Sequence, residues 1–118
     1  MEQTTLFEYV LNNGSATLGA DFKPIEKKRG YCVSLAGFET RLNLSSPSAK
    51  MLFEYYLIVY AERARQSGAF IGLWVNDDTI YFDLSRVYSD KKKALKEGAL
   101  NAQLAIYDLG KQESIFIA

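Results

Sequence analysis

The stretch GLWVNDDTIYFDLS, residues 72–85, places three carboxylates among aromatic and aliphatic side chains. Carboxylates this close in sequence could hold a metal ion or act as general acid and base. A calcium loop needs oxygen ligands at about every second position, a glycine and a closing glutamate, and this spacing does not occur here. Asp77 and Asp78 lie between two strand-like runs, so we interpret them as turn residues. Asp83 lies within the second run, where it either faces solvent or pairs with a cation such as Arg86.

Other reactive side chains are scarce. The chain contains no histidine, which removes the usual general base and the commonest zinc ligand. Cys32 is the only cysteine, and without a second cysteine or a histidine to activate it we interpret it as a small hydrophobic strand residue. No glycine pattern makes a phosphate loop. We therefore expect no catalytic residue, no metal site, no cofactor and no enzymatic activity.

The composition predicts one folded domain, residues 1–118. Hydrophobic residues make up 48% of 118 residues, which is enough for a core without disulfide or metal support. Fourteen Lys and Arg balance fourteen Asp and Glu, so no net field attracts nucleic acid or a membrane surface. The chain has no signal-like start and no long apolar run, and a single cysteine fits a reducing compartment. These features predict a cytoplasmic protein with no membrane partner.

The order of helix and strand signals predicts an α+β fold, with a mainly antiparallel sheet and one long and one short helix packed on it. Both a hairpin and a short helix fit residues 1–22, and the Asn-Gly pair favours the hairpin. Residues 31–44 read as two short strands broken near Gly37. Ser46 is expected to cap a long helix from about Pro47 to Ser67, which Gly68 ends.

The second half of the chain contains two further pairs of strands. The runs AFIGLWV and TIYFDLS, joined by NDD, predict a hairpin. Ser89 then caps a short, Lys-rich helix that ends near Leu100. The last two strands are separated by Gly110.

The long helix has more apolar surface than a core stripe requires. Projection at about 100° per residue places the core residues on one side: Ala49, Leu52, Phe53, Tyr56, Leu57, Tyr60 and Ala64. Met51, Tyr55, Ile58 and Val59 fall outside this stripe, near Arg65. Either the N-terminal segment covers them and the helix is internal, or they bind a partner or a second copy of the chain. We predict that these five residues bind a partner.

Cationic side chains gather in two runs: Lys27, Lys28 and Arg29, and Lys91, Lys92 and Lys93. Arg86 lies shortly before the second run. Lysines in the first turn of a helix oppose the helix dipole unless Asp90 or an outside anion offsets them. The second run and Arg86 therefore predict contact with an anionic partner, either an acidic protein surface or nucleic acid.

A resemblance adds a biological setting. It rests on Gly72, Trp74, Val75, Tyr81, Asp83 and Ser85, followed by NAQLAIYDL at 101–109. This pattern resembles a recurring signature in small uncharacterised proteins of bacteriophages and mobile genetic elements, over roughly the last 50 residues, and its motifs are of the fold-forming kind. The resemblance implies an accessory protein and no catalytic residues. One role it implies is to block a host defence system, as an anti-CRISPR protein does, by direct binding.

Together these observations predict a non-enzymatic protein that acts by stoichiometric binding to another protein, with a homodimer as the simplest form. The alternative is a nucleic-acid or nucleoprotein binding module that uses the two cationic runs.

Overall fold

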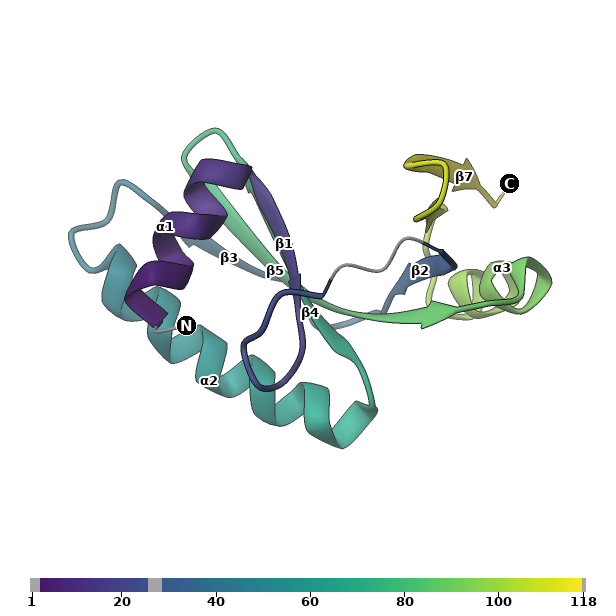
Figure 1. Cartoon of the computed structure of the whole chain (residues 1–118), viewed down its shortest axis with the longest axis horizontal. Coiled ribbons are helices and arrows are strands. Elements are labelled where there is room, and N and C mark those ends of the chain that lie inside the picture. Colours follow the sequence, from purple (N-terminus) through teal and green to yellow (C-terminus); the bar gives the residue numbers. More distant parts are fainter. Residues whose placement is uncertain (1–2, 26–28, 118) are drawn as a thin grey trace. The chain divides into compact units, whose positions relative to one another are not determined.

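The computed structural model describes residues 3–25 and 29–117 and confirms the α+β fold. Within these residues it contains three helices and seven strands, with neighbouring strands antiparallel (Figure 1). The chain divides into two compact units. Unit 1 comprises Met1–Ile25 and Glu39–Leu84, and unit 2 comprises Glu26–Phe38 and Ser85–Ala118.

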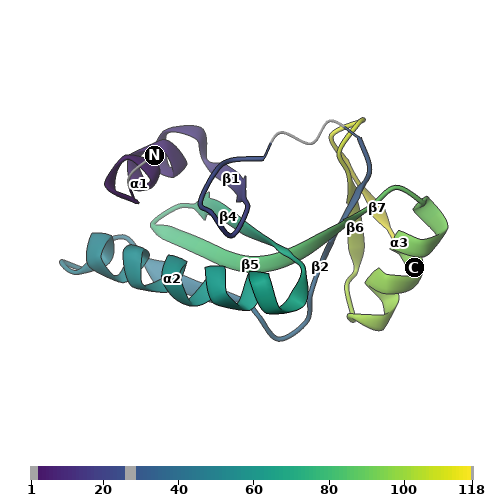
Figure 2. The same ribbon diagram turned by 60° about the horizontal axis from the view of Figure 1, so that its bottom comes forward.

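Unit 1 consists of two helices and four strands. In chain order they are α1 (Gln3–Asn13), β1 (Ser15–Leu18), β3 (Thr40–Asn43), α2 (Ala49–Ser67), β4 (Phe70–Asn76) and the first part of β5 (Thr79–Tyr88). β1 pairs with β4, β4 pairs with β5, and β3 pairs with residues 79–82 of β5. Figure 2 shows α2 alongside these strands.

The core of unit 1 is aromatic at its centre. Phe82 on β5 has its ring centroid 5.7 Å from that of Phe53 and 5.5 Å from that of Tyr60, both on α2. Phe7 of α1 packs on Phe53 with the centroids 5.0 Å apart. Period-two alternation in β5 buries Ile80, Phe82 and Leu84, as the sequence predicts. The helices therefore pack against one face of the strands, the face that carries Phe82.

Of the two alternatives for residues 1–22, the favoured hairpin is wrong and the short helix is found, because residues 3–13 form α1. Leu6 and Val10, one helical turn apart, are 1% and 0% exposed. Gly14, with φ of 78°, donates its N–H to the carbonyl of Val10 at 2.8 Å, so the Asn-Gly pair ends a helix and does not form a hairpin turn. Burial of these two side chains outweighs the local turn signal.

The long helix α2 matches its predicted end but not its predicted start. It begins at Ala49 with Ser48 as the N-cap residue, whereas Ser46 was expected to cap it. The Ser46 hydroxyl instead accepts a hydrogen bond from the Ser48 N–H at 3.3 Å, one turn before the helix. Gly68 ends the helix in the left-handed conformation, with φ of 64°.

Unit 2 consists of one helix and four strand segments. They are β2 (Tyr31–Ser34), residues 85–88 of β5, α3 (Lys91–Leu100), β6 (Ala105–Asp108) and β7 (Glu113–Phe116). β2 pairs with both β5 and β6, and β6 pairs with β7, so the last two predicted strands are confirmed. Its core contains Val33, Ala94 and Ile106. The N-cap residue of α3 is Asp90 and not the expected Ser89.

The strand β5 has residues in both units, and each unit is built from two separate stretches of chain. The single domain predicted from the sequence stays a prediction that an unfolding experiment can test. None of the helices in residues 3–25 and 29–117 combines the length and apolar content that crossing a bilayer requires.

Candidate functional site

The three acids of residues 72–85 do not form a reactive cluster. Asp77 and Asp78 make the two-residue turn between β4 and β5, as predicted, and Asp77 has a φ of 54°. The Asp78 carbonyl accepts a hydrogen bond from the Leu44 N–H at 2.6 Å. The Asp83 carboxylate lies over Gly72, where a Cβ atom would collide with it. Among the described residues, no group of three or more Asp, Glu, His or Cys side chains could hold a metal ion.

A stacked aromatic pair, which the sequence analysis missed, lies in the β4–β5 hairpin. The rings of Trp74 and Tyr81 are nearly parallel, at 11°, with their centroids 4.1 Å apart. The Arg41 guanidinium is 5.2 Å from the Tyr81 centroid, and Arg41 Nε is 3.2 Å from a carboxylate oxygen of Glu39. Trp74 and Tyr81 are equally distant from the two-residue turn, and this symmetry is a sequence signal that predicts their pairing. We assign the pair a stabilising role in the hairpin.

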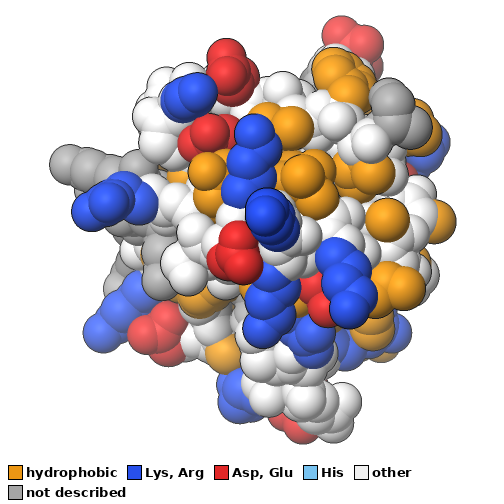
Figure 3. All heavy atoms as spheres, turned by 90° about the vertical axis from the view of Figure 1, so that its right-hand side faces the viewer, with side chains coloured by type: hydrophobic (Ala, Val, Ile, Leu, Met, Phe, Trp, Pro, Cys, Tyr) orange, Lys and Arg blue, Asp and Glu red, His pale blue; other side chains and the backbone are white. Residues whose placement is uncertain are grey.

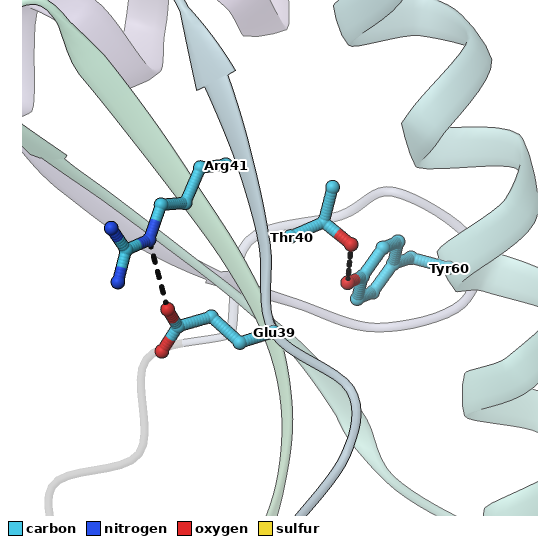
Figure 4. A network of polar contacts seen from close by, with 4 residues as sticks. All are labelled: Glu39, Thr40, Arg41 and Tyr60. Carbon is cyan, nitrogen blue, oxygen red and sulfur yellow. Dashed lines mark hydrogen bonds and ion pairs between the residues drawn. The ribbon is translucent and has the colours of Figure 1, made fainter.

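A part-buried pair of hydroxyl groups lies on the opposite side of β3. Figure 4 shows Thr40 directed toward Tyr60 of α2, whereas Glu39 and Arg41 lie on the other side of the strand. The Tyr60 phenol donates a hydrogen bond to Thr40 Oγ1 at 2.6 Å. Burial raises the pKa of Tyr60, so its phenol stays protonated and is a structural group.

The predicted partner-binding residues of α2 form an exposed line. Met51, Tyr55 and Ile58 are 65%, 60% and 58% exposed, and their spacing of four and three residues places them on one side of the helix. We call these three residues the outer strip. Arg65 lies farther along the same side and pairs with Glu62 at 2.8 Å.

Because the outer strip is exposed, α1 does not cover it. Phe7 of α1 instead contacts Phe53, on the core side of α2. Val59 differs from the other predicted residues because it is half-buried, and it belongs to the edge of the strip.

The lysines at positions 91–93 of α3 are exposed, whereas Arg86 of β5 is half-buried. Residues 91–93 form the first turn of α3, and Asp90 offsets them locally by accepting the Lys92 N–H at 3.0 Å. Lys93 Nζ lies 5.7 Å from the Tyr88 ring centroid. Arg86 lies opposite Val33 in the strand pair, and its contact with an anionic partner stays a prediction. Lys27 and Lys28 lie outside the described residues, and only Arg29 of that run is described.

A pocket of about 500 Å³ opens in unit 2, where the paired strands β2 and β5 end. Tyr31 and Tyr88, which lie opposite each other in the strand pair, contribute to its walls. The described residues that line it are Arg29, Gly30, Tyr31, Val87, Tyr88 and Ser89. Gly30 has a φ of 109°, and a Cβ atom there would lie 2.9 Å from Val87 Cγ1, so this position favours glycine. The sequence analysis identified Arg29 but missed the pocket.

Formal charge is distributed unequally between the two units. Unit 1 carries five Lys and Arg against nine Asp and Glu, a net charge of −4. Unit 2 carries nine Lys and Arg against five Asp and Glu, a net charge of +4. The zero net charge of the whole chain therefore conceals a basic unit, and the argument from net charge against an anionic partner does not apply to unit 2.

Comparisons of the chain with models of protein families, with curated proteins and with solved structures find no match. The resemblance of residues 72–109 to phage and mobile-element proteins stays a prediction. The outer strip of α2 and the pocket of unit 2 each combine exposure with a defined chemistry.

Proposed function

We propose that this protein is a non-enzymatic binding protein that docks on another protein chain through the outer strip of α2. The observation that carries the proposal is the exposure of three large apolar side chains, Met51, Tyr55 and Ile58, in one line on a helix whose other side fills the core. A monomer gains little from apolar side chains in this position, whereas an interface would remove them from water. Aromatic residues and Met are also enriched at the centres of interfaces.

The partner that fits the strip best is a second copy of the chain. Positions 51, 55, 58, 62 and 65 follow each other at intervals of four, three, four and three, which is the spacing of a coiled-coil seam. The first three positions are apolar, and the last two hold the ion pair of Glu62 and Arg65. Two antiparallel α2 helices related by a two-fold axis at Ile58 would place Arg65 of one copy beside Met51 of the other. The aliphatic stem of Arg65 would then cover the methionine while its charge stays in water. A two-fold contact needs only this one self-complementary surface.

The test measures self-association of the full chain by analytical ultracentrifugation over a range of concentrations. A contact along one helix is at the small end of interfaces, so we expect a monomer–dimer equilibrium that shifts with concentration. Ile58→Glu and Tyr55→Glu should each yield a monomer with an unchanged circular dichroism spectrum. Lys50→Glu, on the same helix but outside the strip, is the matched control and should dimerise as the wild type does.

A wild-type chain that stays monomeric at all concentrations contradicts the homodimer. Loss of folding in Ile58→Glu would show that the strip is structural and contradict the whole proposal.

The resemblance of residues 72–109 supports a further partner, a host defence complex that an accessory protein of a phage or mobile element would block. In this case the outer strip, with Arg65 at its rim, would contact the complex. Purified defence nucleases, including CRISPR effectors, can be assayed with a stoichiometric amount of the wild-type chain and of Ile58→Glu. Inhibition by the wild type alone would support this partner, and equal activity with and without the wild type across the panel would contradict it.

A further inference from the structure

The pocket of unit 2 combines flat aromatic walls with positive charge. Its volume of about 500 Å³ is in the usual range for pockets that hold small ligands, about 300–1,000 Å³. Tyr31 and Tyr88 also pack against the core residues Val33, Ala94 and Ile106, so their positions are fixed by the fold. None of the described residues that line the pocket is acidic, and Arg29 is the cationic residue among them.

The positive charge continues from the pocket onto α3. Lys93 Nζ lies over the ring of Tyr88, at 5.7 Å from its centroid, and residues 91–93 are all exposed. Figure 3 looks onto the side that carries α3 and β7, where Lys and Arg side chains gather with Asp, Glu and hydrophobic side chains among them. Through Lys93, α3 adds a cation beside Tyr88 to the residues that line the pocket.

Two acidic residues lie next to residues that line the pocket, one along the chain and one across the sheet. Both accept hydrogen bonds from backbone N–H groups. Asp90, which follows Ser89, accepts the Lys92 N–H at 3.0 Å. Asp108, which lies opposite Tyr31 in the strand pair, accepts the N–H groups of Gly110 and Lys111 at 3.0 and 3.1 Å. Both carboxylates have a structural role in shaping a turn or a helix start, and the Lys and Arg side chains keep an excess of positive charge.

We propose that this pocket binds a nucleotide unit of a single-stranded nucleic acid. The base would lie against Tyr31 or Tyr88, and the phosphates would contact Arg29, Lys93 and the neighbouring lysines. A flat apolar ring joined to a phosphate is the ligand that matches aromatic walls with a cationic rim. An acidic protein surface would use the cations but not the tyrosines. In a duplex the bases are stacked on each other and not available to the pocket, which favours a single strand.

The test is fluorescence anisotropy of the full-length chain with a labelled single-stranded oligonucleotide, as DNA and as RNA, at low salt. Arg29→Glu combined with Lys93→Glu should weaken binding at least about tenfold and reduce the salt dependence, since each lost phosphate contact lowers the slope by about 0.7 on a logarithmic scale. Tyr88→Leu should weaken binding at least about fivefold through lost stacking. Lys23→Glu combined with Lys50→Glu, at two exposed lysines of unit 1, makes the same change in formal charge and should bind as the wild type does.

Competitors identify the chemistry that is recognised. Unlabelled mononucleotide should displace the oligonucleotide more effectively than inorganic phosphate does, which would support recognition of base and phosphate together. Polyglutamate that competes as well as the oligonucleotide, or binding that Tyr88→Leu leaves unchanged, would overturn the proposal in favour of an acidic protein. Equal affinity for a duplex, or no binding at low salt, would also overturn it.

This inference is independent of the outer strip. Ile58→Glu, which should abolish dimerisation, should leave affinity for the oligonucleotide within about twofold of the wild type, because Ile58 is not among the described residues that line the pocket. Failure of one proposal is therefore distinguishable from failure of the other.

Discussion

The phenol of Tyr60 donates a hydrogen bond of 2.6 Å to Thr40 Oγ1, which joins α2 to β3 inside unit 1 (Figure 4). Tyr60 is buried, and its ring also packs on Phe82, with the two centroids 5.5 Å apart. The bond gives the buried phenol a hydrogen-bond acceptor on β3. It therefore positions α2, and with it the outer strip, against the strands.

Replacing Tyr60 with phenylalanine tests this bond. The ring and its packing remain, but the hydrogen bond is lost. We therefore expect the free energy of unfolding, measured in urea, to be about 1–2 kcal/mol lower than that of the wild type. Thr40→Val should cost a similar amount. Because the two residues share one bond, the double variant should be less destabilised than the sum of the two single variants, and full additivity would contradict the bond.

The stability of the fold at alkaline pH should depend on the same residue. Burial, which outweighs the opposing effects of Thr40 and Arg63, raises the pKa of Tyr60 above 10.0, its ordinary value. Because the folded state holds the phenol proton more tightly, the contribution of Tyr60 is complete below about pH 10 and is lost as the pH rises from the unfolded pKa to the folded pKa. Tyr60→Phe should therefore lose less stability than the wild type above pH 10, measured by urea unfolding at each pH. If the free energy of unfolding fell equally with pH in the two proteins, the buried phenol of Tyr60 would not be the cause of the loss.

A side chain at position 72 should destabilise the protein while Asp83 is present, because the Asp83 carboxylate would have to move. A Cβ atom at position 72 would collide with the Asp83 carboxylate, which lies directly over it. We expect Gly72→Ala to destabilise the protein by about 1–3 kcal/mol. The same substitution made in an Asp83→Ala background should cost clearly less, because the colliding carboxylate is gone. Thermal unfolding of the four proteins of this cycle gives the coupling, and equal costs in both backgrounds would show that the collision does not occur.

The helix α1 should depend on the burial of its inner side chains. Val10 is 0% exposed, so Val10→Ala should cost about 1–3 kcal/mol through lost packing. Leu11, its neighbour, is 38% exposed, and Leu11→Ala should cost distinctly less. A strand in this segment would also separate Val10 from Leu11, but it would place Glu8 on the same face as Leu6 and Val10. In α1 Glu8 is exposed, so Glu8→Ala should leave chemical denaturation almost unchanged, and a cost as large as that of Val10→Ala would contradict the helix.

The two compact units should unfold together. Each is assembled from two separate stretches of chain, and β5 belongs to both, so loss of one unit removes a strand from the other. The only tryptophan, Trp74, reports on unit 1 by fluorescence, and the only cysteine, Cys32, reports on unit 2 by its reactivity toward a thiol reagent. Both probes should give the same urea midpoint. Two separate midpoints would contradict the single domain predicted from the sequence.

Local signals were sufficient for much of unit 1. Gly68 marks the end of α2 because only the left-handed conformation, which glycine adopts without strain, closes the helix there. The Asp77 and Asp78 turn and the alternation of buried residues in β5 follow from the period of two in the sequence. The exposure of Met51, Tyr55 and Ile58 follows from their angle to the core stripe of the helix. Each of these features depends on residues that are close together in the chain.

Other features depended on contacts between distant segments, which no local pattern records. Residues 3–13 form a helix because Leu6 and Val10 are buried in the core of unit 1, and this burial outweighs a turn signal at Asn13 and Gly14. The pocket combines residues 29–31 with residues 87–89, which meet only because β2 pairs with β5. The opposite charges of the two units likewise depend on how separate stretches of chain assemble. A short stretch of sequence contains only one of the two residues in each such contact. The contact therefore stabilises the protein only after the chain has folded and brought the two residues together.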